Sequence, residues 1–378
     1  MRLFIYDGDE KEGGFGRVFR ARVIDEPQKF VAVKKCHVTD HVKHPRLLHE
    51  ACALVLLQGH SAIPLVHAWG RSQFYEYLAL ELLHTDLNAL RTKLTLRNLV
   101  ALSHQVLEGL EYIHSRGIVH CDIKPSNLML APTEGAEPGR VRIIDFGICR
   151  PYRDPTTLEH LPDKGTPRSV GTSSFVSLNV HLHHSPSRRD DVESLSYTIL
   201  SLIAGRLPWD SPTGLCLSSR TVFTLKRQWT GTRLVGLGDV SVFGELVDYA
   251  RLLDYTEKPD YARWKERLRS LPVPNMLKDP LYDPSITSAA TTMESGSPLT
   301  SQSILPPPSK PLSNLEGSDG LWRPTFTWDQ AIPVADDELL GDEEEIVRAR
   351  LDTLDGVPEG QEDHLSIYCR EVMHPLRR

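Results

Sequence analysis

Two stretches near the middle of the chain constrain its fold and chemistry more than any others. The first reads HCDIKPSN and spans residues 120–127, and the second is the triplet Asp145-Phe146-Gly147. Together they supply an Asp, an Asn five residues later, and a second Asp before a Phe-Gly turn. Phosphoryl transfer needs a group that orients the attacking hydroxyl and hard oxygen ligands for Mg²⁺. We therefore expect Asp122 to be the base and Asn127 and Asp145 to bind Mg²⁺.

The overall composition fits a chain with a large folded part. It has 378 residues, 40% of them hydrophobic, which is enough for one large or two average domains. The formal net charge of −7 argues against a nucleic acid partner. The six cysteines are scattered, with no close pair at zinc-ligand spacing, so we expect free thiols and an intracellular location, in the cytoplasm or nucleus. The acidic N-terminus does not resemble a signal peptide, and no stretch has the apolar length of a membrane span.

Hydrophobic periodicity predicts strands first and helices later. LFIY, RVFRARV and KFVAVKK have the pattern of strands around a Gly-rich turn, and YLALELL that of a further strand. A helix in PRLLHEACALVLLQG is expected to end at Gly59, and one in RNLVALSHQVLEGLEYIHSRG at Gly117. DDVESLSYTILSLIAG is expected to be a helix buried on most sides. The expected fold class is therefore α+β, with a small β-rich lobe followed by a larger helical lobe.

The composition changes near residue 276. Residues 1–275 have the pattern of a folded domain, whereas 276–320 are rich in Ser, Thr and Pro and are expected to form a disordered linker. An acidic C-terminal tail, at most partly helical, is expected over 321–378. Its acidic run at 336–345 is interpreted as a solvated tail, with a pseudosubstrate segment for a basic groove as the alternative.

A Gly-rich turn and a strand lysine complete the set needed for phosphate binding. Gly13, Gly14 and Gly16, followed by Val18, would let backbone N–H groups approach phosphate oxygens, although Lys11 stands where the full pattern has its first Gly. Lys34 is expected to reach the phosphates of ATP and to pair with Glu50 on the next helix, while Lys35 faces the other side of the strand. Lys124 would contact the γ-phosphate.

These residues and several longer stretches resemble the eukaryotic protein kinases over about residues 3–270, and within them the casein kinase 1 group. VGTSSFVSLN stands where most kinases have Ala-Pro-Glu. The other stretches are LLHEACALVLLQGHSAIP, RPYRD after the Asp-Phe-Gly turn, SRRDDVESL, Leu207-Pro208-Trp209 and KPDY.

The resemblance implies a bilobal kinase fold with ATP in the cleft and transfer of its γ-phosphate to Ser or Thr. It implies that Thr172 bonds the region of the base and that Asp191 is a buried anchor for the catalytic-loop backbone. The residues it places around the adenine are Ala32 and Met129, with Leu80 as gatekeeper and Glu81 to Leu83 as the hinge.

The resemblance also implies protein substrates with acidic or already phosphorylated Ser/Thr sites, and a monomer as the default state. Arg188, Lys226 and Arg227 would line the anion site that reads such substrates. Trp229 stands where the group has a further Lys, so one basic contact is lost. Cys121 replaces the Arg that in many kinases pairs with a phosphate on the activation loop. We therefore predict no activation by loop phosphorylation.

The sequence alone leaves other interpretations open. The departures at Lys11, Cys121 and Ser196 are compatible with a catalytically weak pseudokinase that acts as a scaffold. A small-molecule kinase shares the Asp, Asn and Asp arrangement but not the Asp-Phe-Gly turn. The histidines at 181, 183 and 184 are interpreted as exposed loop residues rather than as a metal site.

Overall fold

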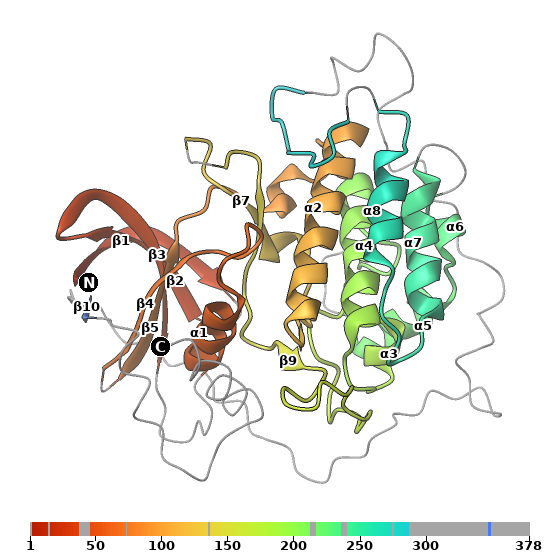
Figure 1. The fold of residues 1–378 in the computed structure, drawn as a ribbon, viewed down its shortest axis with the longest axis horizontal. Helices are drawn as coiled ribbons and strands as arrows, with labels where there is room; N and C mark the ends of the chain where they lie inside the picture. Colours follow the sequence, from red (N-terminus) through yellow and green to blue (C-terminus); the bar gives the residue numbers. More distant parts are fainter. Residues whose placement is uncertain are drawn as a thin grey trace. The chain divides into compact units, whose positions relative to one another are not determined.

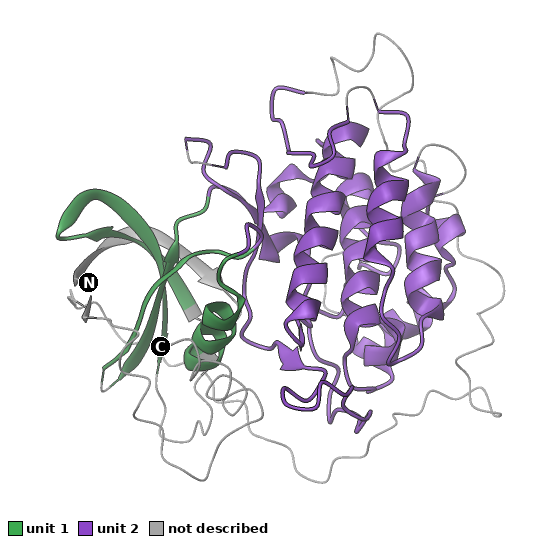
Figure 2. Ribbon diagram, in the orientation of Figure 1, with its two compact units in different colours: residues 1–59, 63–83, 328–378 green, residues 60–62, 84–327 purple. Residues whose placement is uncertain are grey.

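The computed structural model places the chain in two compact units, one β-rich and one helical (Figure 2). The first comprises residues 1–59, 63–83 and 328–378, and the second residues 60–62 and 84–327. The expected α+β class is confirmed, since most strands of the sheet precede most of the helices along the chain. The residues that the structure describes are 2–13, 16–37, 46–72, 74–134, 137–211, 217–235, 240–273, 276–286 and 347–348.

The β-rich unit is built on one antiparallel sheet with the strand order β10-β1-β2-β3-β5-β4 (Figure 1). One face carries its core, because small and branched residues alternate with polar ones along the strands. The helix α1 (Arg46–Leu57) belongs to this unit and ends before Gly59, whose φ of +99° suits glycine. The strands are β1 (Arg2–Gly13), β2 (Gly16–Val23), β3 (Glu26–His37), β4 (Val66–Arg71), β5 (Tyr75–Glu81) and β10 (Val347–Arg348).

The helical unit is organised around its two long helices, α2 (Leu96–Ser115) and α4 (Arg188–Ala204). The helix α8 packs against α2, and α7 packs against α4 (Figure 1). Thr95 caps α2 by accepting a hydrogen bond from Asn98 N, and Gly117 (φ +89°) follows its end. Every residue of α4 from Asp190 to Ala204 is buried, as its apolar sequence predicted. The helices of this unit are α2 (Leu96–Ser115), α3 (Leu178–His181), α4 (Arg188–Ala204), α5 (Ser219–Arg227), α6 (Gly231–Val235), α7 (Ser241–Leu252) and α8 (Tyr261–Arg269).

Short strands and 3-10 turns connect these helices and position the polar residues predicted to act in catalysis. β6 (Ile118–Val119) pairs with β9 (Arg150–Pro151), and β7 (Leu128–Leu130) pairs with β8 (Val141–Ile143). A 3-10 turn, η2 (Pro125–Asn127), lies between β6 and β7, and another, η1 (Leu87–Leu90), precedes α2. The stretch 120–127 is therefore fixed at both ends by strand pairing.

The folded region extends beyond the boundary expected at residue 275. Residues 276–286 lie along α2, because two buried amides of that helix bond their backbone. Asn98 donates to the carbonyl of Asp283 at 2.8 Å and accepts from its N–H at 3.1 Å, and Gln105 donates to the carbonyl of Pro280 at 3.0 Å. The predicted start of the linker therefore lies too early in the sequence. Ser and Thr become frequent only after this segment.

Most of the expected linker and tail lies outside the described residues, including 287–320 and the acidic run at 336–345. Val347–Arg348 are an exception in the tail, and they form a strand that pairs with Arg2 and Leu3 rather than a helix. Within the described part of the chain, the helices are too short or too polar to cross a membrane.

Candidate active site

The β-rich unit holds the predicted phosphate-binding lysine against a glutamate. Lys34 lies on β3, and its Nζ is 2.7 Å and 2.8 Å from the two carboxylate oxygens of Glu50 on α1. Glu50 is 2% exposed, so this pair is far better shielded than a surface ion pair. Lys35 faces the other side of β3, with its Nζ 3.9 Å from the ring centre of Tyr75.

The register of the sheet brings further predicted nucleotide-binding residues to the side of Lys34. Val18 on β2 pairs with Lys34, and Ala32 on β3 pairs with Leu80 on β5. Directly paired residues, and residues two apart on one strand, project from the same face of a sheet. The four side chains therefore share the face on which Lys34 meets Glu50.

The remaining nucleotide-binding predictions fall at the ends of strands. Gly13 and Gly16 pair at the end of the β1–β2 hairpin, while Gly14 lies outside the described residues. Glu81 ends β5, and its N–H donates to Leu65 O at 2.8 Å. Leu83 follows shortly after it, and in the helical unit Met129 occupies the middle of β7.

A buried carboxylate that the sequence did not single out fixes the start of α1. Glu76 on β5 is 3% exposed and accepts hydrogen bonds from the backbone of Leu47 and Leu48 in the first turn of the helix. Burial raises the pKa of Glu76, while Arg71 and these N–H groups act in the opposite direction. A carboxylate at a helix N-terminus satisfies N–H groups that have no partner within the helix. Glu76 thus helps to set the position from which Glu50 reaches Lys34.

In the helical unit, Asp122 is the centre of a dense hydrogen-bond network. Its Oδ1 accepts from both the backbone N and the Oγ1 of Thr172, at 2.9 Å and 2.8 Å. Lys124 Nζ lies 2.8 Å from Asp122 Oδ2 and donates to Thr172 Oγ1 at 2.9 Å. Asn127 Nδ2 donates to Asp122 O and Oδ2 at 2.9 Å and 3.1 Å. The four residues expected to cooperate are therefore brought together.

The β7–β8 ladder places Asp145 beside Asn127. Its last pair is Leu128 with Ile143, and one residue further on the N–H of Ile144 donates to Asn127 O at 3.0 Å. Asp145 comes next, with a left-handed φ of 68° that Asp tolerates better than most residues. Two oxygen-bearing side chains, separated in sequence, therefore leave the same end of one hairpin.

His120 connects the loop that contains Asp122 with the chain just before Asp145. Its Nδ1 accepts from the backbone N–H of Asp122 at 3.2 Å, and its Nε2 donates to Ile144 O at 3.0 Å. The ring also makes an edge contact, 4.8 Å between centroids, with Phe146, which is completely buried. A neutral imidazole with its proton on Nε2 satisfies both hydrogen bonds.

Asp191 anchors the backbone ahead of the base, as the resemblance implied. Its carboxylate accepts from His120 N at 2.7 Å and from Cys121 N at 2.9 Å. Burial alone would raise the pKa of Asp191, but the hydrogen bond from His114 and the nearby His120 hold this pKa below its usual value. His114 on α2, 2.9 Å from Asp191 through its Nε2, escaped prediction because a single His on an apolar helix face carries no motif.

The Cys121 side chain is buried, and it cannot pair with a phosphate as an arginine at this position would. Its backbone is left-handed, with a φ of 71°, and its side chain is buried with Sγ 3.6 Å from Val119 O. Burial, and next the charge of Asp191, raise the pKa of the Cys121 thiol well above its usual value. The thiol is therefore held in its neutral, unreactive form.

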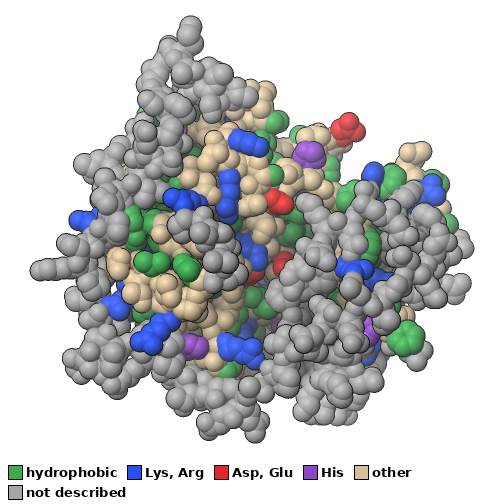
Figure 3. Space-filling view, turned by 180° about the vertical axis from the view of Figure 1, so that it is seen from behind, with side chains coloured by type: hydrophobic (Ala, Val, Ile, Leu, Met, Phe, Trp, Pro, Cys, Tyr) green, Lys and Arg blue, Asp and Glu red, His purple; other side chains and the backbone are tan. Residues whose placement is uncertain are grey.

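The predicted anion site is not assembled in the structure, so this prediction was wrong for its lysine. Lys226 has no exposed surface, and Arg227 is 7% exposed with its guanidinium 5.4 Å from the ring centre of Phe223. Arg188 lies over the ring of Tyr152 at 4.6 Å and donates to Thr256 O. Trp229 is a core residue rather than a lost basic contact. On the face shown in Figure 3, the Lys and Arg side chains of the described residues are dispersed among uncharged groups.

The interpretation of His181 as an exposed loop residue was also wrong. It ends α3 and is completely buried, with its Nδ1 2.9 Å from Ser219 Oγ. His183 and His184 are partly exposed and contact Thr166 O and Asp163.

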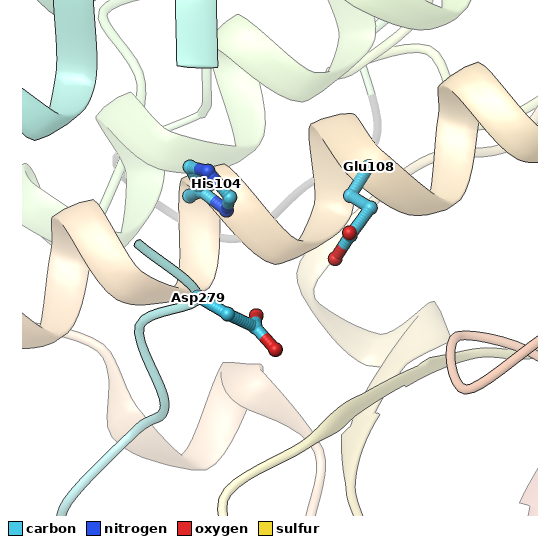
Figure 4. A group of neighbouring side chains, drawn as sticks. All are labelled: His104, Glu108 and Asp279. Carbon is cyan, nitrogen blue, oxygen red and sulfur yellow. The ribbon is translucent and has the colours of Figure 1, made fainter. Parts of the chain in front are cut away.

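A second polar cluster lies away from Asp122, where the segment 276–286 meets α2. His104 and Glu108, one turn apart on α2, face Asp279 from the segment (Figure 4). A cation would compete here with arginines, because Asp279 already forms a bidentate pair with Arg140 and His104 Nε2 lies 3.3 Å from Arg269. Burial and next Arg269 lower the pKa of His104 to about 4. The cluster is therefore an ionic contact that holds the segment against the helix.

A family model described as protein kinase domain matches residues 11–229, which is more than half of the chain. The chain belongs to the protein kinase family. The kinase is therefore a phosphotransferase, and the matched region contains Lys34, Glu50, Asp122, Asn127 and Asp145.

Protein kinases generally use ATP and Mg²⁺, and the residues of this kinase fit the metal. Asn127 turns its Nδ2 toward Asp122, which leaves its Oδ1 as the atom available to a cation. Asp145 adds a carboxylate from the same end of the β7–β8 hairpin. Carboxylate and amide oxygens are hard ligands of the kind that Mg²⁺ prefers.

Proposed function

We propose that this protein is a serine/threonine kinase of the casein kinase 1 type that transfers the γ-phosphate of ATP to Ser or Thr in proteins. The observation that carries this proposal is the set of contacts among Asp122, Lys124 and Thr172. A lysine two residues after the base contacts both the base and a threonine from the loop that follows the Asp-Phe-Gly turn. Such a network holds a carboxylate where an aliphatic hydroxyl can donate to it.

In this proposal, Asp122 orients the attacking hydroxyl and accepts its proton. Its Oδ1 accepts two hydrogen bonds from Thr172 and its Oδ2 contacts Lys124 and Asn127, so the carboxylate that the substrate hydroxyl approaches is fixed on both sides. Lys124, next to Oδ2, carries the positive charge that offsets charge on the transferred group. Asn127 and Asp145 would hold Mg²⁺, which when bound neutralises charge on the phosphate oxygens.

The β-rich unit supplies nucleotide binding in the same proposal. Lys34, fixed by Glu50, binds phosphate oxygens, and a fixed ammonium loses less entropy on binding than a free one. Val18, Ala32 and Leu80 present apolar surface on the same face of the sheet for the adenine. The resemblance to the kinases also implies adenine contacts by Met129 and by the backbone from Glu81 to Leu83.

Substrate preference has to be reconsidered within this proposal. Lys226 and Arg227 are buried, so they do not support recognition of a phosphate next to the acceptor. We therefore propose that the kinase accepts Ser and Thr sites, including acidic ones, without requiring prior phosphorylation. A monomeric form acting on intracellular proteins remains our working proposal.

The proposal is tested by transfer of labelled γ-phosphate from Mg-ATP to casein and to matched peptides that differ only in Ser, Thr or Tyr at the acceptor position. Transfer to Ser and Thr but not Tyr, lost in Asp145→Asn, is the expected result. A phosphorylated and an unphosphorylated form of the Ser peptide should have similar kcat/KM. Binding of ATP without any transfer would favour a pseudokinase scaffold instead.

A further inference from the structure

The chain after Thr172 forms a single helical turn beside the base. The N–H groups of Phe175 and Val176 both donate to Thr172 O, at 2.8 Å and 3.0 Å. The turn is too short for its later carbonyls to find partners within itself. The carbonyls of Ser173 and Val176, and that of Ser174, are instead bonded by side chains from distant parts of the helical unit.

Lys226 on α5 provides the largest share of these bonds. Its Nζ donates to Ser173 O at 2.8 Å and to Val176 O at 2.6 Å, and lies 3.3 Å from His181 Nε2. An ammonium group has three N–H donors, so these three acceptors use all of them. Lys226 has no exposed surface, and no water is needed to satisfy it.

Two aromatic rings and a histidine surround the Nζ of Lys226. Its Nζ lies 4.8 Å from the ring centre of Tyr197 and 5.4 Å from that of Trp209, within the range of cation–π attraction. Burial lowers the pKa of Lys226, and the charge of Glu193 opposes this effect. Burial and then Lys226 lower the pKa of His181 to about 2, so the imidazole remains the neutral acceptor that the lysine needs.

Trp209 bonds the carbonyl of Ser174, which Lys226 does not contact. Its Nε1 donates to Ser174 O at 2.8 Å, and the neighbouring Asp210 accepts from Ser174 Oγ at 2.6 Å. Trp209 is 1% exposed, so this contact is shielded from water like that of the lysine. Lys226 and Trp209 together hold three of the carbonyls of the turn from its buried side.

The opposite side of the turn faces the base. Gly171, Thr172, Ser173 and Ser174 retain exposed surface. A Cβ at Gly171 would collide with Cys121 O and would stand 3.5 Å from Asp122 Oδ1. An acceptor hydroxyl has to come within hydrogen-bonding distance of Asp122, so residues flanking the acceptor must pass over this exposed edge.

We propose that Lys226 is a positioning residue for the acceptor peptide, acting through the turn formed by residues 172–176. Its three hydrogen bonds set the orientation of the turn from behind, and Trp209 assists at Ser174. This role rests on the proposed kinase function and deepens it. It assigns to Lys226 an effect on peptide binding without any contact with the peptide.

The test compares Lys226→Met and Trp209→Phe with the wild-type full-length protein, and with Lys258→Met as a control at an exposed lysine. The peptide KM should rise at least tenfold in Lys226→Met and by a smaller factor in Trp209→Phe. The KM for ATP should change less than twofold. A merely structural role would lower the active fraction, and therefore kcat, and would leave both KM values unchanged.

Hydrogen exchange gives a second readout that does not need activity. The amides of Phe175 and Val176 should exchange at least tenfold faster in Lys226→Met, while those of α2 keep their rates. Unchanged exchange, or an unchanged peptide KM in both variants, would overturn the proposal. If Lys226→Met does not fold, Trp209→Phe decides by the same two readouts. A wild-type protein that transfers no phosphate would contradict the proposed function, whereas the exchange comparison would still test the positioning role.

Discussion

The backbone N–H and the hydroxyl of Thr172 donate to the same carboxylate oxygen of Asp122, at 2.9 Å and 2.8 Å. Two donors on one oxygen fix the rotation of the carboxylate, and its other oxygen contacts Lys124 and Asn127. The residues are 50 positions apart in sequence, so the contact ties the loop after the Asp-Phe-Gly turn to the catalytic loop.

Replacing the Thr172 hydroxyl should slow turnover more than it affects binding. Thr172→Val keeps the N–H donor and removes the hydroxyl, whereas Thr172→Ser keeps both. A hydrogen bond to a charged group contributes about 1.5–3 kcal/mol, which corresponds to a roughly 10- to 100-fold loss of kcat in Thr172→Val. Steady-state kinetics with Thr172→Ser as the matched control measure this effect. A kcat for Thr172→Val equal to that of the wild type would show that the hydroxyl does not support the base.

Adjacent lysines on β3 should behave differently. Lys34 contacts Glu50, whereas Lys35 lies over Tyr75 on the other side of the strand. We expect Lys34→Met to raise the KM for ATP or abolish transfer, because the phosphates lose the ammonium group and the buried Glu50 loses this ion pair. Lys35→Met should stay within about twofold of the wild type, since an exposed cation–π contact is worth only about 0.5–1 kcal/mol. Equal defects in the two variants would argue against nucleotide binding by Lys34 specifically.

Truncation should separate the segment 276–286 from the rest of the C-terminal region. A chain ending at residue 275 loses the backbone of Asp283 that bonds the buried Asn98 amide, and one of the bonds of Gln105, and each unsatisfied buried group costs about 1–3 kcal/mol. Its Tm should fall by roughly 5–10 °C relative to a chain ending at residue 286, given the usual relation between free energy and Tm. Thermal unfolding of the two proteins checks this. Identical Tm values would mean that the segment contributes nothing to stability.

Comparing the chain ending at 286 with the full-length protein addresses the acidic run at 336–345 separately. A higher kcat/KM for acidic peptides in the shorter protein would support the pseudosubstrate interpretation. Equal values would leave the run as a solvated tail.

His104 should make stability depend on pH. Its pKa is about 4 in the folded protein and 6.5 as the ordinary value, so the unfolded chain takes up the proton first as the pH falls. Stability is therefore full above about pH 6.5 and decreases toward pH 4, by at most ~1.4 kcal/mol per pH unit from this group. Urea unfolding should show a shallower loss over this window in His104→Gln, which keeps an acceptor for Arg269. His84→Gln, at an exposed position, is the control, and parallel pH profiles for all three proteins would contradict the assignment.

Phosphatase treatment should leave the activity unchanged. The Cys121 side chain is buried against Val119 O and offers no cation to a phosphate. The base is held instead by Asp191 through the backbone and by Thr172. Transfer rates before and after treatment, with complete dephosphorylation verified by intact mass, should agree within about twofold. The prediction is wrong if activity disappears and returns when the loop is phosphorylated again.

Much of the active site could be predicted because its chemistry demands given residue types at short spacings. Asp122, Lys124 and Asn127 lie within one loop. The phosphate-binding motif around Lys34 predicted its partner Glu50, and the alternation of side chains along the strand predicted the opposite orientation of Lys35. In these cases the local sequence contains most of the geometry. The β7–β8 pairing that brings Asp145 to Asn127 was added by the structure.

The sequence by itself determined the fold class, the main strands and helices and the candidate catalytic residues, because hydrophobic period and local spacing encode them. Only the tertiary structure decided what Lys226, His181 and residues 276–286 do. The sequence around Lys226 does not show whether its side chain is exposed or buried, because its burial depends on carbonyls 50 and 53 positions away. The free energy of a charged side chain is set by the groups that replace water around it, and these come from distant parts of the chain.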